Sequence, residues 1–250
     1  MKRLGILCSI AILLFSCSAD SNGGTTSDSS QQLDGQGGSL ATFALAGNYL
    51  YVVDQSDLNV FDIRNASEPV LVNKVVSIGF NIETLFAYKD FLYIGSRNGM
   101  FIYSILNPEF PEKLSQVEHF TACDPVVAND TYSFVTLHSN TFCGNDINVL
   151  EIYDITNAQE PMLVSRRNLI FPRGLGLYGD YLVVCDDEIK IFDISDAANS
   201  KLVQTIDRFA FDVIISGDLL IAIGENGLFQ YQLSSSEGTV NYDALSEIAI

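Results

Sequence analysis

The stretch Tyr49-Leu50-Tyr51-Val52-Val53-Asp54 reads as a short hydrophobic strand, and after a polar turn a second strand closes on Phe61-Asp62-Ile63. The same arrangement returns four more times. The later first strands begin at Phe91, Tyr132, Tyr181 and Leu219, and the later closing triplets begin at Tyr103, Tyr153, Phe192 and Tyr231. The closing aromatic residues are 42, 50, 39 and 39 residues apart. A period near forty residues with several strands per unit predicts an all-β protein, a β-propeller.

Each repeat can be divided into four strands, so the sequence predicts five four-stranded blades. The turns between first and second strands fall at Gly47, Lys89, Asn129, Gly179 and Gly217. No long segment has a 3.6-residue period, which predicts very little helix. Strand exchange between residues 40–46 and the C-terminal strand would close the ring. A distorted closure is the alternative, because the fifth repeat is less regular than the others.

The first 16 residues have the organisation of a secretory signal peptide. Lys2 and Arg3 precede an apolar stretch that is too short to span a bilayer as a helix. The stretch ends in Leu14-Phe15-Ser16-Cys17, which resembles the lipobox of bacterial lipoproteins. The resemblance implies that Cys17 is lipidated and anchors the protein in the cell envelope, on the outer membrane, with the periplasmic or surface orientation open. An ordinary secretory signal with an incidental cysteine is the alternative.

Residues 17–38 consist mainly of Ser, Gly, Asp, Gln, Asn and Thr. Such a segment cannot bury enough apolar surface to fold, so we expect a flexible tether after Cys17. The propeller of five repeats then spans residues 39–250, a normal size for one all-β domain.

The chain is strongly acidic, with 13 basic and 31 acidic residues and a formal net charge of −18. This charge argues against binding to nucleic acid and against docking on anionic lipid through a basic patch. The negative charge is compatible with binding of cations, basic partners or neutral glycans. It is also compatible with a role in solubility alone.

In two of the repeats, the first hydrophobic strand resembles the repeat of a known family. Leu50-Tyr51-Val52-Val53-Asp54 and Leu182-Val183-Val184-Cys185-Asp186 are similar to the LVIVD repeat, which is named for this strand. The segments from Cys123 to Val127 and from Pro172 to Gly176 resemble LVIVD-repeat lipoproteins of the Bacteroidetes type. The resemblance implies a β-propeller in the cell envelope and supplies no established activity or catalytic residue.

One rim of the predicted disc is the candidate ligand site. In a four-strand meander, the start of the first strand and the hairpin between the second and third strands lie on the same rim, where propellers usually bind ligands. The candidate residues on this rim are Glu83, Asp124, Arg173, Asp186, Asp187 and Asp212. Ordinary turn chemistry is the alternative, because Asp is a common turn residue, and Arg173 then forms a structural pair with Asp124 or Asp212.

The cysteines and the recurrent aspartates have structural explanations. Cys123 and Cys143 fall on the same rim, and outside the cytoplasm we expect a disulfide between them. Cys185, in a hydrophobic strand, is expected to be a buried free thiol. The aspartates of the closing triplets are expected to accept hydrogen bonds from turn N–H groups; they are Asp62, Asp154 and Asp193.

The motifs of the common enzyme classes are absent from the sequence. With only two histidines, His119 and His138, a multi-histidine metal site is excluded. We therefore expect a non-enzymatic, membrane-anchored binding or scaffold module with an envelope protein or glycan as partner, and without nucleic acid, cofactor or metal. One alternative is a carbohydrate- or cation-binding protein that uses the acidic rim. The other is a hydrolase with a carboxylate pair at the channel mouth.

Overall fold

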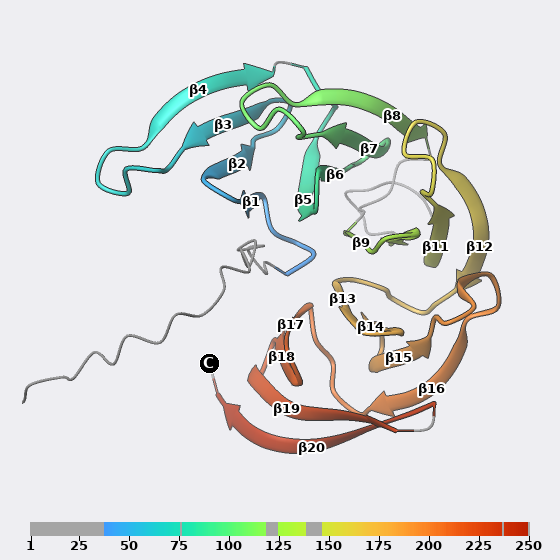
Figure 1. The fold of residues 1–250 in the computed structure, drawn as a ribbon. Coiled ribbons are helices and arrows are strands. Elements are labelled where there is room, and N and C mark those ends of the chain that lie inside the picture. The colour runs from blue at the N-terminus through green and yellow to red at the C-terminus, as the bar shows by residue number, and fades with distance from the viewer. Residues whose placement is uncertain (1–37, 76, 119–124, 139–146, 237, 250) are drawn as a thin grey trace, which may run out of the picture. The chain divides into compact units, whose positions relative to one another are not determined.

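Twenty β-strands form five antiparallel four-stranded sheets in the part of the chain that the structure describes (Figure 1). The structure is a computed structural model, and it describes residues 38–75, 77–118, 125–138, 147–236 and 238–249. In each sheet the strands are neighbours in chain order, with the first strand nearest the centre (Figure 1). The expected all-β propeller of five four-stranded blades is confirmed.

The blades follow the sequence repeats. Blade 1 contains β1 (Phe43–Ala46), β2 (Tyr49–Val53), β3 (Leu58–Asp62) and β4 (Val70–Val75). Blade 2 contains β5 (Ile82–Tyr88), β6 (Phe91–Ser96), β7 (Gly99–Ser104) and β8 (Glu112–Glu118). Blade 3 contains β9 (Val126–Ala128), β10 (Tyr132–Leu137), β11 (Val149–Asp154) and β12 (Met162–Asn168). Blade 4 contains β13 (Leu175–Tyr178), β14 (Tyr181–Cys185), β15 (Ile189–Asp193) and β16 (Lys201–Ile206). Blade 5 contains β17 (Asp212–Ser216), β18 (Leu219–Gly224), β19 (Gly227–Ser236) and β20 (Thr239–Ile248).

Helical structure is minimal, as the sequence predicts. A short 3-10 helix, Ala197–Asn199, precedes β16. None of the described residues belongs to a helix that is long and apolar enough to cross a membrane.

The turns between first and second strands fall where the sequence predicts them. Gly47, Lys89, Gly179 and Gly217 have φ values of 56°, 50°, 55° and 59°. These left-handed conformations suit tight hairpin turns, and glycine adopts them at little cost. In blade 3 the side chain of Asn129 stabilises the turn, because its Oδ1 accepts hydrogen bonds from the N–H groups of Thr131 (3.0 Å) and Tyr132 (2.8 Å).

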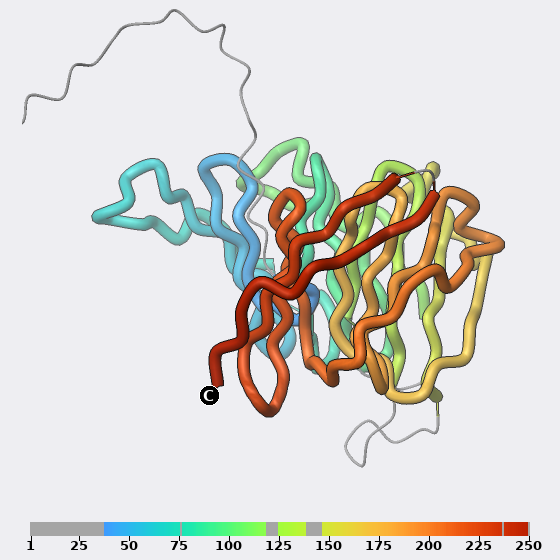
Figure 2. Tube along the Cα trace, turned by 90° about the horizontal axis from the view of Figure 1, so that it is seen from below, coloured from blue at the N-terminus to red at the C-terminus, as the bar shows by residue number. Residues whose placement is uncertain are grey.

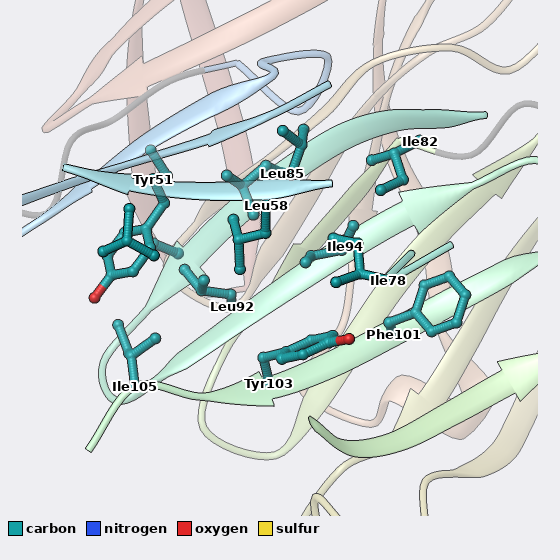
Figure 3. Close-up of a cluster of buried hydrophobic side chains, with 14 of the residues drawn as sticks. Tyr51, Leu58, Ile78, Ile82, Leu85, Leu92, Ile94, Phe101, Tyr103 and Ile105 are labelled. Carbon is teal, nitrogen blue, oxygen red and sulfur yellow. The ribbon is translucent and has the colours of Figure 1, made fainter. Parts of the chain in front are cut away.

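The core consists of hydrophobic clusters between neighbouring blades. Four clusters join blades 1 and 2, 2 and 3, 3 and 4, and 4 and 5. Figure 3 shows the first of them, where Leu58 of blade 1 lies beside Leu92 of blade 2 and Phe101 of blade 2 lies beside Ile78. Full burial of one such side chain contributes about 1.5–3 kcal/mol, so these clusters dominate the stability of the fold.

Hydrogen bonds reinforce all four of these contacts at the periphery, and in blade 3 the donor is Arg167, which donates to the carbonyl oxygen of Ser200 in blade 4. A side chain on the fourth strand of one blade donates to a backbone carbonyl oxygen of the next blade. In the other three contacts the donors occupy equivalent positions, and the pairs are Asn73 with Glu109 (2.8 Å), Ser115 with Ala158 (2.7 Å) and Gln204 with Val240 (3.4 Å). In blade 5 the equivalent residue, Ser246, donates instead to Gln230 of its own sheet (2.8 Å).

The first and last blades do not pack on each other as the other neighbours do. Among the described residues no buried cluster joins blade 5 to blade 1. Every residue of β14 is buried, because both of its faces are covered, whereas burial alternates along β18. Figure 2 shows blade 5 in red, with its long outer strands β19 and β20 of 10 residues each.

Near the centre, the chain entering blade 1 bridges to blade 5. Ser39 Oγ donates to Asp212 Oδ1 (3.0 Å), and Leu40 N–H donates to Asp212 Oδ2 (3.2 Å). The expected strand exchange is wrong, because β1 pairs with β2 and β20 pairs with β19. Blades 5 and 1 are linked through these hydrogen bonds of Asp212 and, within the described residues, lack the apolar packing of the other neighbours, which is the distorted closure given as the alternative.

Candidate functional site

The described rim residues all lie where the sequence places them, at one end of the sheets. Glu83 is in β5, Arg173 precedes β13, Asp186 and Asp187 follow β14, and Asp212 begins β17. Asp124 lies outside the described residues. The side chains of this rim are largely engaged in hydrogen bonds and ring contacts within the fold.

Asp186 and Asp187 hold two loops together. The Asp186 carboxylate is fully buried and accepts hydrogen bonds from the backbone N–H groups of Ile170 (3.0 Å to Oδ1) and Phe171. Lys190 Nζ lies 2.6 Å from Asp186 Oδ2 and 2.5 Å from Asp187 Oδ1. The hydrogen bond from Lys190 holds the pKa of Asp187 below its usual value. This arrangement ties the segment before β13 to the turn after β14.

Asp212 is also a structural residue. In addition to Ser39 and Leu40, it accepts a hydrogen bond from Val213 N–H (2.9 Å). Burial raises the pKa of Asp212, and these hydrogen bonds oppose the shift. The carboxylate lies so close to Gly174 that a Cβ atom there would approach Oδ1 to 2.1 Å. Asp212 therefore fixes the chain at the junction between blades 1 and 5.

Arg173 lies against aromatic rings. Its guanidinium carbon is 4.6 Å from the ring centroid of Phe171, 5.0 Å from Phe211 and 5.5 Å from Phe209. These are cation–π distances. Arg173 and Asp212, which both lie in the part of the chain that the structure describes, do not form a salt bridge. Asp124, the other predicted partner of Arg173, lies outside the described residues.

Glu83 is the last of the described rim residues, and it pairs with an arginine. Glu83 Oε1 lies 4.0 Å from Arg97 Nε, and burial raises the pKa of Glu83 while Arg97 opposes the shift. Within the described ranges, no group of three His, Cys, Asp or Glu side chains could hold a metal ion.

The recurrent aspartates shape the turns, as expected. The N–H groups of Arg64, Thr156 and Ser195 donate to Asp62 (2.9 Å), Asp154 (2.8 Å) and Asp193 (2.9 Å). Side-chain and then backbone hydrogen bonds from these donor residues lower the pKa of all three carboxyl groups. In blade 2, Ser104 Oγ accepts the corresponding bond from Leu106 N–H (3.3 Å).

Cys185 is a buried free thiol, as the sequence predicts. Burial raises the pKa of this thiol well above its usual value, which disfavours the reactive thiolate. Cys17, Cys123 and Cys143 lie outside the described residues, so their lipidation and disulfide remain predictions.

The structure contains a pocket that the sequence analysis missed. It has a volume of about 540 Å³ and lies between β8 of blade 2 and the strands β11 and β12 of blade 3. Val117, Leu137 and Leu163 give it apolar walls, and its charged lining residues are Glu118, Glu151 and Arg166. The signal in the sequence was Glu151, a charged residue within the hydrophobic run Val149–Tyr153.

A second unpredicted feature is the uncovered face of blade 1. Phe43 is 56% exposed, whereas the residues in the equivalent position of the other blades are at most 2% exposed; they are Leu85, Val126, Leu175 and Val213. The closing aromatic Phe61 is likewise only half-buried, whereas its four counterparts are buried. In blades 2 to 5, the preceding blade covers this face.

The opposite face of blade 5 is uncovered as well. Ile223 is 42% exposed, whereas its counterparts in blades 1 and 4, Val53 and Cys185, are buried against the next blade. Gln230 occupies a position that holds Val or Ile in the other four blades, where that residue is at most 1% exposed; the counterparts are Val60, Ile102, Ile152 and Ile191. We call these two uncovered faces, on blades 1 and 5, the seam.

Comparison with a family model supports the repeat. The model described as the LVIVD repeat matches residues 37–76 and 173–208, which contain blades 1 and 4. This agrees with the LVIVD resemblance of two strands and with a repeat-built β-propeller. No curated protein matches the chain.

Solved structures share the fold at low sequence identity. A periplasmic gluconolactonase from Pseudomonas aeruginosa is 12% identical, with a TM-score of 0.62 over 82% of this chain and 68% of that chain. A protein from Lactobacillus plantarum is 13% identical, with a TM-score of 0.65 over 80% of this chain and 67% of that chain. At these identities the likeness concerns the fold alone.

Proposed function

We propose that this protein is a non-enzymatic binding or scaffold module of the bacterial cell envelope, anchored through lipid on Cys17 and joined by residues 17–38 to the propeller. The signal-like N-terminus and the lipobox resemblance support the anchor. The structural roles of Asp186, Asp187 and Asp212 support a function other than catalysis at the rim, because these carboxylates are already engaged in the fold.

The observation that carries the proposal is the seam. An apolar sheet face that stays exposed is a common feature of protein interaction sites. Inside this chain, the surface that covers the equivalent face is always the apolar sheet of a neighbouring blade. We therefore propose that the partner is an envelope protein that presents a β-sheet with apolar side chains to blade 1.

Site-specific photocrosslinking on intact cells tests this function. A photoreactive phenylalanine analogue replaces Phe43 in one variant and Phe110 in the control. Phe110 is a matched control because it is 59% exposed and lies in the loop between β7 and β8, away from the seam. We expect one stoichiometric product with a different envelope protein from position 43 and no such product from position 110.

Binding of the purified partner then gives a quantitative check. Burial of a phenylalanine side chain contributes about 1.5–3 kcal/mol, and Phe43 is already partly buried, so Phe43→Ser should weaken binding roughly tenfold. Phe110→Ser should leave the affinity unchanged. Wild-type affinity of Phe43→Ser, or a crosslinked product that consists of two copies of this chain, would contradict the proposal.

The rival functions have less support. The acidic rim would need accessible carboxylates to bind a cation or glycan, and its described members already have partners. The hydrolase alternative needs a carboxylate pair, whereas Glu83 lies beside Arg97 and Asp212 holds residues 39 and 40.

A further inference from the structure

The pocket between blades 2 and 3 contains a buried ion pair. The Glu151 side chain is fully buried, and its Oε1 accepts hydrogen bonds from Arg166 Nε (2.7 Å) and Nη2. The hydroxyl of Tyr153 donates to the other carboxylate oxygen. The Arg166 side chain is 52% exposed, so the pair extends from the interior to the pocket.

The other blades show that the fold does not require this ion pair. The residue equivalent to Glu151 is Phe101 in blade 2 and Phe229 in blade 5, and both rings are buried. The residue equivalent to Arg166 in blade 2 is Gln116. A buried ion pair is a weak source of stability, and an apolar replacement of similar volume is often neutral or stabilising. Blade 3 therefore keeps a charged pair and a cavity where blades 2 and 5 have an aromatic side chain. In blades 1 and 4 the equivalent residues are Asn59 and Lys190, and Lys190 pairs with the turn residues Asp186 and Asp187 instead of with the fourth strand.

The lining indicates the chemical class of the ligand. Glu118 and Glu151 disfavour an anion, as does the net charge of −18. Arg166 and Tyr153 already engage both oxygens of Glu151, so the charged lining offers a cation only Glu118, and the guanidinium of Arg166 opposes it. Arg166 is a donor and Glu118 an acceptor, so a row of hydroxyl groups, which both donate and accept, can satisfy the two. The apolar side chains of Val117, Leu137 and Leu163 suit the C–H faces of such a molecule. The volume of about 540 Å³ lies within the usual range for small-molecule sites.

We propose that this pocket binds an uncharged, hydroxyl-rich small molecule, a neutral sugar ring, between blades 2 and 3. Arg166, oriented by Glu151, donates to the sugar hydroxyls, and Glu118 accepts from them. The pocket lies between blades 2 and 3, away from the seam, and includes none of the six candidate rim residues, so it does not depend on the proposed protein partner.

Saturation-transfer NMR on the full chain tests the proposal. The probes are glucose, galactose, N-acetylglucosamine and maltose at millimolar concentration, with glucuronate and glucosamine as charged counterparts. We expect saturation transfer to at least one neutral sugar and at least tenfold weaker binding of the charged ones. Absence of binding by all four neutral sugars, or preferential binding of a charged one, would overturn the proposal.

Two variants locate the binding. The double variant Glu151→Phe/Arg166→Gln copies the residues of blade 2 into blade 3, so it should fold and lose the sugar signal. Leu163→Trp should fill the pocket and weaken binding at least tenfold. Its matched control, Leu202→Trp, changes the equivalent residue of blade 4, which is 47% exposed against 49% for Leu163, and should bind normally. Wild-type binding by the folded double variant would show that the sugar binds elsewhere.

Discussion

At the residue scale, single side chains distinguish blades that share one backbone pattern. Glu151 occupies a position that two other blades fill with phenylalanine, and its burial is tolerated because Arg166 and Tyr153 satisfy both carboxylate oxygens. The sequence displayed this exception as a glutamate within a hydrophobic strand. Its partner could not be predicted with the same ease, because Arg166 comes from the next strand and the pairing depends on register.

The Glu151–Arg166 pair leads to a stability prediction that does not depend on any ligand. Arg166→Gln leaves a buried carboxylate without its cation, and this should lower the free energy of unfolding by about 3 kcal/mol, the low end for a broken buried pair, because Arg166 is half exposed. Urea unfolding measures the change. The double variant Glu151→Phe/Arg166→Gln should recover wild-type stability or exceed it. A double variant that is less stable than Arg166→Gln would contradict this explanation.

At the element scale, the strands and turns follow closely from the sequence. Hydrophobic runs between turn residues define the second strands of all five blades, and the closing triplets end the third strands of blades 1 to 4. The β-bulge that directly precedes the closing aromatic residue in every blade was not predicted, because it depends on pairing with the fourth strand. The recurrent aspartates were predictable because turn chemistry is local.

Those aspartates predict a pH dependence of stability. The folded-state pKa of Asp62, Asp154 and Asp193 lies below the value in the unfolded chain, which is about 4. Each group therefore contributes stability above pH of about 4, and this contribution is lost as the pH falls through the lowered folded-state pKa. The free energy of unfolding should decrease over this acidic range.

Asp193→Ser provides the matched variant, because blade 2 has Ser104 in the same position and serine does not titrate. Urea unfolding at a series of pH values should show a shallower acid-induced loss for this variant than for the wild type. Equal slopes for the two proteins would mean that the Asp193 carboxylate does not contribute to acid sensitivity.

At the scale of the whole propeller, the number of blades was predictable and the closure was not. The forty-residue period determines how many blades form. Whether the last blade covers the first depends on contacts between the two ends of the chain, and the apolar run Leu219–Ile223 looks the same whether one or both of its faces are covered. The less regular fifth repeat was one signal, and Gln230 was a second, a polar residue where the other repeats have Val or Ile.

The seam between blades 5 and 1 is uncovered in the free protein, and we propose that a partner covers it in the cell envelope. Carbene footprinting of Phe43, with the buried Leu85 as internal reference, tests it in the purified protein and on cells. We predict strong labelling of Phe43 in the purified protein and protection on cells, with Leu85 unlabelled in both. Protection of Phe43 to the level of Leu85 in the purified monomer would mean that blade 5 closes on blade 1, and it would contradict an open seam.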